Sequence, residues 1–207
     1  MSTNCCLRKQ RLKLTLRPAS NFSYVTIWQA MKFIYLFFFC FVVGESVCQK
    51  YTLEKGSASF FSHAAIENIA AKNEKVAGLF NASTGDVAFS IPINEFQFAK
   101  SLMKEHFNEK YMESDKYPKS TFQGKVVGFD LNSNQMHQAV AAGKLTIHGQ
   151  TKDVEIPGTI EKQGDRLIFK AKFIAKLEDY KIKIPQLMWQ NIAEQVEVTV
   201  DFVFKPQ

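Results

Sequence analysis

No cysteine follows Cys48 in this chain of 207 residues, because all four cysteines lie at positions 5, 6, 40 and 48. The part of the chain after Cys48 therefore contains no disulfide, no thiolate nucleophile and no cysteine-based zinc site. Glycine and proline are also scarce, with ten and six residues, which excludes collagen-like and low-complexity proteins. The 46% of hydrophobic and 22% of charged residues are typical of a globular protein.

The greater part of the chain also lacks an excess of one charge sign. The net charge is +6, but six of the 26 basic residues and only one of the 20 acidic residues precede residue 49. The rest of the chain is almost neutral and has no basic run of the kind that binds phosphate backbones. We therefore expect no nucleic-acid partner.

Residues 31–48 have the pattern of a secretory signal peptide. A positive charge at Lys32 precedes an apolar run over residues 33–43, and small residues precede a cleavage site that we place between Cys48 and Gln49. A lipoprotein interpretation, with Cys48 acylated, is the less favoured alternative. The apolar run is shorter than the roughly 20 residues of a membrane-spanning helix. We expect an exported protein, periplasmic or secreted, without an integral membrane span in the mature chain.

Residues 1–30 are basic and contain neither Asp nor Glu. We interpret them as an upstream extension outside the fold, with the true start at Met31; a transit peptide is the alternative, since such leaders are rich in arginine and poor in acidic residues. Residues 49–207 are expected to form one domain, which is long enough to bury a sizeable core.

Alternation of apolar and polar residues dominates the part of the chain after residue 48 and predicts strands with one buried face. Clear examples run over residues 87–91, 145–147, 154–156, 167–173 and 196–204. Gly164-Asp165 predicts a hairpin turn, and residues 148–153 predict a longer one. Repeated short strands with one apolar face indicate a β-sandwich or a β-barrel.

Residues 101–112 break this alternation and predict an amphipathic helix of about three turns. Its apolar stripe is formed by Met103, Phe107 and Tyr111, which recur every four residues, and lysines and glutamates take the opposite side. The segment 114–118 ends the helix. In a chain built of strands, such a helix most often covers one end of the sheet structure.

Recognisable catalytic and metal-binding motifs are absent from the sequence. The histidines, at positions 63, 106, 137 and 148, show no paired ligand spacing, and no nucleophile elbow, phosphate loop or dinucleotide fingerprint occurs. We interpret His148 as a solvated turn residue. His106 either meets a lipid head group or, as we favour, hydrogen-bonds a strand carbonyl. We expect no enzyme, no metal and no cofactor.

Four segments resemble the YceI-like family of exported lipid-binding proteins: residues 76–80, 102–107, 114–122 and 143–154. The last segment, a strand with a His-Gly turn and a Thr-Lys pair, is the most recognisable, and the similarity spans roughly residues 51–204. The resemblance implies an all-β fold, an eight-stranded antiparallel lipocalin-like barrel with one inserted amphipathic helix. Lys104-Glu105 stands where many members of the family carry Arg-Asp.

The resemblance also implies an elongated apolar cavity for a lipid with a long apolar chain, such as an isoprenoid lipid or quinone. We assign the contacts with this lipid to inward-facing strand residues and to the helix: Phe80, Phe89, Phe96, Phe98, Leu102, Met103, His106, Phe107, Phe122, Leu145, Ile147, Phe169 and Phe173. The alternation alone favours a solid core, because phenylalanines fill a barrel as readily as they line a tube. The resemblance reverses that preference.

Three hypotheses about function follow. The first is a non-enzymatic carrier or store that holds a polyisoprenoid or similar amphipathic lipid. The second is a filled barrel that acts through surface loops, for example residues 132–138. The third, an enzyme acting on a lipid with Glu105 and His106 as acid and base, ranks last because no catalytic constellation supports it. The lipid's identity and length, and a homodimer, stay open.

Overall fold

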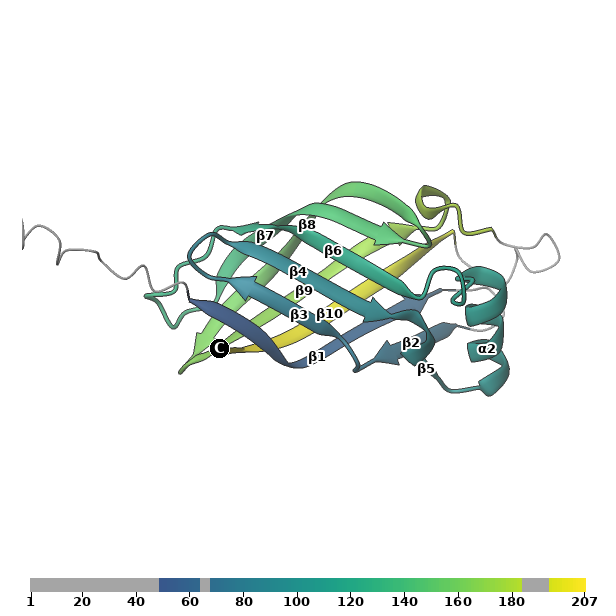
Figure 1. The fold of residues 1–207 in the computed structure, drawn as a ribbon, viewed down its shortest axis with the longest axis horizontal. Coiled ribbons are helices and arrows are strands. Elements are labelled where there is room, and N and C mark those ends of the chain that lie inside the picture. Colours follow the sequence, from purple (N-terminus) through teal and green to yellow (C-terminus); the bar gives the residue numbers. More distant parts are fainter. Residues whose placement is uncertain (1–48, 64–67, 184–193) are drawn as a thin grey trace, which may run out of the picture. The chain divides into compact units, whose positions relative to one another are not determined.

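The computed structural model describes residues 49–63, 68–183 and 194–207, which form a closed antiparallel β-barrel (Figure 1). The strands are β1 (Lys50–Ser62), β2 (Ile69–Asn73), β3 (Ala77–Asn81), β4 (Asp86–Pro92), β5 (Gln97–Phe98), β6 (Lys119–Val127), β7 (His137–Ile147), β8 (Gln150–Gln163), β9 (Arg166–Lys176) and β10 (Gln195–Pro206). The wall consists of β1, β3, β4 and β6 to β10. The predicted eight-stranded antiparallel barrel is confirmed.

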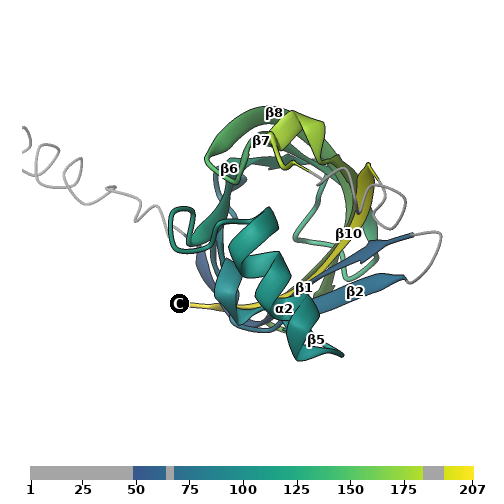
Figure 2. The same ribbon diagram turned by 90° about the vertical axis from the view of Figure 1, so that its right-hand side faces the viewer.

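The barrel closes between the first and the last strand, which pair from Tyr51 opposite Pro206 to Phe61 opposite Glu197. Figure 2, a view along the barrel, shows β1 beside β10. On its other side β1 pairs first with β3 and then with β2, and β5 adds to the outer side of β2. Closure pairs strand edges that would otherwise be exposed.

The alternating runs of the sequence all lie in strands of this barrel. The predicted strands over 87–91, 145–147, 154–156, 167–173 and 196–204 fall within β4, β7, β8, β9 and β10. Along β9 and β10, the residues with the least exposure occur at every second position, among them Leu167, Phe169, Phe202 and Phe204. One face of each strand is therefore directed into the barrel, as the alternation requires.

The two predicted hairpin turns have different outcomes. Gly164-Asp165 is confirmed as a two-residue turn, because Gln163 pairs with Arg166. The predicted turn over 148–153 is too long: only His148-Gly149 turns, and β8 already begins at Gln150. Both turn residues have positive φ, 49° and 70°, which is the backbone of the tightest hairpin connections.

The predicted helix is confirmed over most of its length. It comprises α2 (Ser101–His106) and a wider-turned continuation, η2 (Phe107–Tyr111), in which Met112 N–H donates to the carbonyl of Phe107, 2.8 Å away and five residues earlier. The chain leaves the helix at Glu113, where φ is 44°. Figure 2 shows α2 lying across one end of the barrel.

Short 3₁₀ turns complete this end of the barrel. These are η1 (Ile93–Glu95), directly after β4, and η3 (Glu178–Tyr180), directly after β9. Ile93 and Tyr180 are both buried, and Ile93 N–H donates to the carbonyl of Pro118, 2.9 Å away. The bond of Ile93 thereby ties the end of β4 to the segment that follows the helix.

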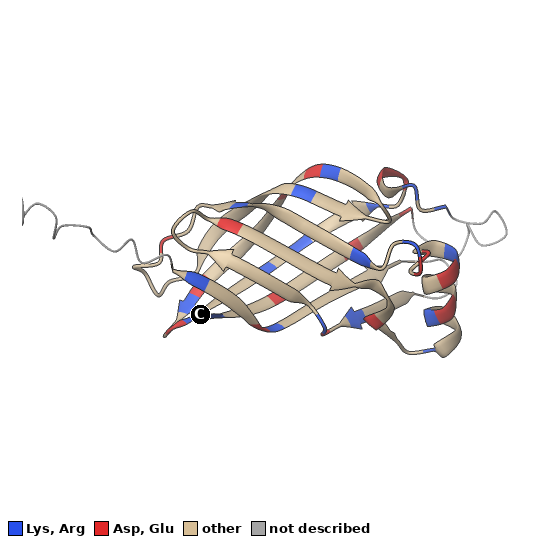
Figure 3. Ribbon diagram, viewed as in Figure 1, with Lys and Arg blue, Asp and Glu red and all other residues tan. Residues whose placement is uncertain are grey.

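Positions of positively and negatively charged residues are scattered over the strands and the helix (Figure 3). The upstream extension (1–30) and the signal peptide (31–48) that we predict lie outside the described residues. Among the residues that are described, no helix combines the length and the apolar character needed to cross a membrane.

Candidate functional site

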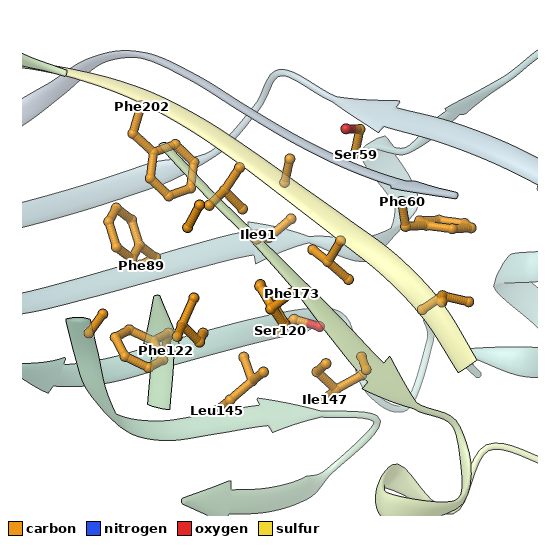
Figure 4. Close-up of a pocket in the computed structure, with 18 of the residues that line it drawn as sticks. Ser59, Phe60, Phe89, Ile91, Ser120, Phe122, Leu145, Ile147, Phe173 and Phe202 are labelled. Carbon is orange, nitrogen blue, oxygen red and sulfur yellow. The ribbon is translucent and has the colours of Figure 1, made fainter. Parts of the chain in front are cut away.

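The interior of the barrel contains a cavity of about 210 Å³ whose wall is almost entirely apolar. Its lining side chains come from most strands of the wall and from η1, η2 and η3. Figure 4 shows Phe202, Phe89 and Phe122 gathered at one end of this space, and Phe60 and Ile147 at the other. Alternation in the sequence left open whether the barrel is filled or hollow. The cavity shows that its interior is hollow.

The cavity exists because small residues meet at one level of the wall. Ala139 pairs with Gly158, Gly158 with Ala171, Ala171 with Val200, and Val200 with Ala58. This small-residue row runs across five consecutive strands, from β7 through β8, β9 and β10 to β1, and all its members line the cavity. The inward side chains of an eight-stranded barrel either fill it or leave room for one ligand, and a row of small side chains leaves the space open.

Larger residues bound this row on both sides. On the side of the helix, Val198 pairs with Phe60 and Phe173; on the other side, Phe202 pairs with Phe169. Along the barrel axis, the cavity is therefore widest at the small-residue row and narrower on both sides of it.

An aromatic plug closes the end remote from the helix. It consists of Tyr51, Phe80, Phe129 and Phe204, with the ring of Phe80 at its centre, 6.3 Å from Tyr51, 5.5 Å from Phe129 and 6.1 Å from Phe204 between centroids. Phe80 and Phe204 are almost completely buried, and all four residues lie beyond the cavity wall. Such ring pairs add to the stability that burial of their area supplies.

The helix covers the opposite end with a second group of aromatic rings. Phe107 of η2 stacks on Phe60 at 5.3 Å and contacts Phe96 at 5.6 Å between ring centroids. Met112 and Tyr180 complete the cavity wall at this end. Burial raises the pKa of the Tyr180 hydroxyl above its ordinary value, and the neighbouring carboxylate of Asp179 adds to the rise.

His148 packs against this end of the barrel from outside the cavity and joins segments that are distant in the sequence. Its Nδ1 atom lies 3.1 Å from the carbonyl oxygen of Tyr180, its ring meets that of Tyr117 edge-on at 4.6 Å, and its Nε2 atom lies 3.8 Å from the carboxylate of Glu113. Only 12% of the side chain is exposed. Our interpretation of His148 as a solvated turn residue was therefore wrong, because the tight turn directs the ring inward against distant segments.

Most of the residues that we predicted to contact the ligand line the cavity. Those that line the cavity are Phe89, Phe96, Phe107, Phe122, Leu145, Ile147, Phe169 and Phe173. They come from both ends of the space, from the five elements β4, η2, β6, β7 and β9 and from Phe96, which stands between η1 and β5. Whether they bind a lipid stays a prediction.

The remaining predicted contacts lie off the cavity wall. Phe80 belongs to the aromatic plug, and Phe98 packs beside Phe60 and Phe107 from β5. Met103, His106 and Leu102 lie on α2 away from the cavity lining, and Leu102 is 58% exposed. The physical reason is that α2 lies across the end of the barrel, so the cavity is reached by the later residues of the helical segment.

Sequence reasoning missed the small residues and the residues of the turns. The small-residue row was overlooked because we counted only bulky residues as contacts, although Ala171 lies within the predicted strand 167–173 at an inward position. Ile93, Met112 and Tyr180 carry no periodic signal, since they stand at the ends of short helical turns.

The wall offers few groups for chemistry. In the part of the chain that the structure describes, no carboxylate, histidine or cysteine lines the cavity; hydroxyls such as that of Ser120 and an amine, that of Lys170, are its polar groups. Nor do three potential metal ligands gather anywhere among these residues. The arrangement is suited to holding an apolar molecule.

The sequence profile of the YceI-like domain matches residues 51–204. The chain belongs to the YceI-like family. No curated protein sequence matches this YceI-like chain.

Solved structures share the fold of this YceI-like chain. A polyisoprenoid binding domain from Saccharophagus degradans superimposes with a TM-score of 0.66 at 14% identity, covering 76% of this chain and 98% of the other. BcnA of Burkholderia cenocepacia gives 0.62 at 17% identity, with 72% and 95% covered. The YceI protein of Campylobacter jejuni gives 0.54 at 18%, with 70% and 88% covered. At these identities the likeness establishes the barrel fold.

Proposed function

We propose that this YceI-like protein is a non-enzymatic binding protein that holds a polyisoprenoid or similar amphipathic lipid in the barrel cavity, as a carrier or a store. The observation that carries the proposal is the apolar cavity of about 210 Å³ inside the barrel. Its solved relative from Saccharophagus degradans is described as a polyisoprenoid binding domain, which supports the same class of ligand here.

Burial of apolar surface is sufficient for such binding. Each CH₂ group that leaves water contributes about 0.8 kcal/mol, and apolar cavities of roughly this size stay dry and take up small hydrocarbons. A lipid chain needs no charged partner inside the barrel.

The same wall argues against turnover of the bound lipid. Acid–base catalysis needs a titratable group within hydrogen-bond reach of the reacting atoms. Glu105 and His106, the pair considered for an enzyme, lie on α2 and off the cavity wall. Holding and releasing a lipid is the activity that this geometry favours.

Export of the protein is part of the proposal. The pattern of residues 31–48, a charged start followed by an apolar run and small residues, supports a secretory signal. In the periplasm or the medium, a lipid with a long apolar chain needs a carrier protein that shields the chain from water.

Native mass spectrometry of the full-length chain, expressed with its own leader in an exporting bacterial host, tests the proposal. A co-purifying hydrophobic molecule of defined mass, recovered by organic extraction, supports it. A bare protein mass that also fails to change when prenyl lipids are added contradicts it. The filled-barrel hypothesis, with function in surface loops such as 132–138, would then take its place.

A matched pair of variants tests whether the bound molecule lies in the cavity. Ala171→Leu adds bulk to the small-residue row, whereas Lys172→Leu adds the same side chain outside, where the lysine side chain is 62% exposed. We expect Ala171→Leu to lower the affinity about tenfold or more, since it displaces several buried carbon atoms of the ligand. Lys172→Leu should bind as the wild type does.

A further inference from the structure

We propose that His148 is a pH-sensitive latch, which ties the helical cover of the barrel, α2 and η2, to η3 when both nitrogens of its ring are protonated. Acidic pH fastens the cover, and neutral pH loosens it. The inference rests on the proposed lipid-binding function, because a latch on the cover regulates how fast a bound molecule enters or leaves the cavity.

One ring nitrogen of His148 is already engaged. Nδ1 lies 3.1 Å from the carbonyl oxygen of Tyr180. Because a carbonyl oxygen only accepts hydrogen bonds, Nδ1 carries the proton of the neutral ring and Nε2 has a bare lone pair. Nε2 is buried and has no hydrogen-bond partner among the residues that the structure describes. A buried polar atom without a partner is rare in folded proteins, so its surroundings call for a physical explanation.

The group that Nε2 faces is a carboxylate. Oε2 of Glu113 lies 3.8 Å from Nε2, so two lone pairs face each other when the ring is neutral. Protonation turns Nε2 into a donor and gives the ring a positive charge, and a charge-assisted hydrogen bond to Glu113 can then form. The Glu113 side chain is 47% exposed and can shift by the remaining fraction of an ångström. The geometry therefore fits the imidazolium better than the neutral ring.

Glu113 stands where the cover ends. It directly follows Met112, which lines the cavity, and its φ of 44° turns the chain out of the helix. The next N–H, that of Ser114, donates to the carbonyl of Asn108 in η2 over 2.8 Å, so a pull on Glu113 is transmitted to the cover. Tyr180, on the other nitrogen, lies in η3 and also lines the cavity. The doubly protonated ring thus joins two wall elements, whereas the neutral ring holds only η3.

Lys116 and Tyr180 keep one charge state over the range in which histidine titrates, about pH 5 to 8. Tyr117 and Glu113 raise the pKa of the Lys116 amine, and burial raises the pKa of the Tyr180 hydroxyl. The Lys116 amine lies 3.6 Å from Oε2 of Glu113, the oxygen that faces His148. Its side chain is 67% exposed, so it supplies a constant charge that solvent screens. Tyr117 contributes a ring contact to His148.

η3 and β8 bring further charges to this end of the barrel. Glu178 and Asp179 lie in η3, Lys181 follows them, and Lys152 lies in β8. Asp179 pairs with the amine of Lys152 over 3.4 Å. Among the described residues, none of these four forms an ion pair with the imidazole ring. Glu113 is therefore the carboxylate that responds when the ring becomes charged.

Amide hydrogen exchange of the cover tests the latch without any ligand. The amides to follow in the full-length protein are those of Met112 and Ser114, whose N–H groups donate to carbonyls of η2. Their protection factors, corrected for the intrinsic exchange rate at each pH, should be about threefold or more higher at about pH 5.5 than at about pH 8. The reason is that the protonated ring must release Glu113 before the cover opens.

Two variants remove the latch in different ways. Glu113→Gln removes the negative charge and keeps the size of the side chain. His148→Asn keeps a side-chain donor for the Tyr180 carbonyl and tolerates the left-handed backbone, but it does not titrate. In both variants the protection of the cover should be nearly the same at the two pH values. Asp179→Asn is the matched control, because it removes a negative charge from η3 and should keep the pH dependence of the wild type.

Release of a probe connects the latch to the cavity. N-phenyl-1-naphthylamine is an apolar fluorophore that stays uncharged over this range of pH, and dilution of its complex with the full-length protein gives the rate of release. In the wild type, release should be about threefold or more slower at about pH 5.5 than at about pH 8. In Glu113→Gln and His148→Asn the two rates should be nearly equal.

The outcomes separate the latch from the binding function. Wild-type protection that does not change with pH, or a pH dependence that persists in Glu113→Gln, overturns the latch. If one variant does not fold, the other decides, because the two substitutions lie in different segments. Failure of the wild type to bind the probe or any added lipid overturns the proposed function, and the exchange measurement still decides whether His148 fastens the cover.

Discussion

The ring of His148, in the turn between β7 and β8, is hydrogen-bonded to the backbone of Tyr180, 32 residues later in the chain. Nδ1–H donates to the Tyr180 carbonyl over 3.1 Å, and this bond holds η3 against the β7–β8 turn. Because Tyr180 lines the cavity, a residue outside the binding space supports its wall.

Removing the His148 ring is expected to destabilise the barrel. His148→Ala loses the bond to Tyr180 but keeps a Cβ at a φ of 49°, so it should lower the free energy of unfolding by about 1 kcal/mol. His148→Gly loses the same bond but relieves the left-handed strain that histidine and alanine share, so it should be about 1 to 2 kcal/mol more stable than His148→Ala. Chemical denaturation measures both variants, and an alanine variant as stable as the wild type would contradict the structural role of the ring.

Gly149 should tolerate a methyl group less well than Gly164 does. Both have positive φ, 70° and 66°, so alanine costs about 1 to 2 kcal/mol at either position. A Cβ at residue 149 would lie 2.4 Å from a ring carbon of Tyr117, whereas a Cβ at 164 meets nothing within 4 Å.

Gly164→Ala is therefore the control for backbone strain alone. The difference between the two alanine variants, measured as free energies of unfolding in urea, reports the displacement of the Tyr117 ring. The ring of Tyr117 contacts that of His148 at 4.6 Å. Equal losses in the free energy of unfolding for the two variants would show that the Tyr117 ring moves aside without weakening this contact.

Alkaline conditions should destabilise the fold through Tyr180. Burial raises the pKa of its hydroxyl in the folded state, and Asp179 adds to the rise. In the unfolded chain the pKa of a tyrosine hydroxyl is about 10. The hydroxyl is protonated in both states below the unfolded pKa, and its contribution to stability is lost as the pH rises through the folded pKa.

The free energy of unfolding, followed from about pH 9 to 11, should fall less steeply in Tyr180→Phe than in the wild type. Burial also raises the pKa of Tyr111, so the double variant with Tyr111→Phe should fall less steeply still. Identical slopes in all three proteins would show that these hydroxyls ionise in the folded state as they do in the unfolded chain.

The ion pair between Arg166 and Glu54 should stabilise the closure of the barrel modestly. It joins the start of β9 to a bulge in β1 with two contacts, Nε to Oε2 at 2.8 Å and Nη2 to Oε1 at 3.2 Å. Its side chains are 54% and 25% exposed. Arg166→Ala should cost up to about 1 kcal/mol, and less at high salt.

The pair between Lys144 and Asp153 serves as the comparison. It has one contact, of 2.9 Å, and its side chains are 66% and 82% exposed. Lys144→Ala should change the melting temperature by less than the error of a thermal scan. A larger loss from this variant than from Arg166→Ala would show that exposure and two-point contact do not decide the strength of these pairs.

The residues alone were sufficient to predict most local elements. Alternation over 167–173 and 196–204 identified β9 and β10, because a half-buried strand needs one apolar face. The four-residue recurrence from Met103 to Tyr111 identified the helix for the corresponding reason. The turn at His148 was misjudged, since nothing local shows that a histidine adopts positive φ there.

Tertiary structure alone decided that the barrel is hollow and where the hollow ends. Ala58, Ala139 and Ala171 are unremarkable in the sequence; they form one row only because the registers of the strand pairs from β7 through β8, β9 and β10 to β1 bring them to one level. Phe89 and Phe202 likewise meet only across the closed barrel. Alternation assigns each side chain to the inside, but the space left there depends on which inward residues share a level, and strand pairing between distant segments determines that.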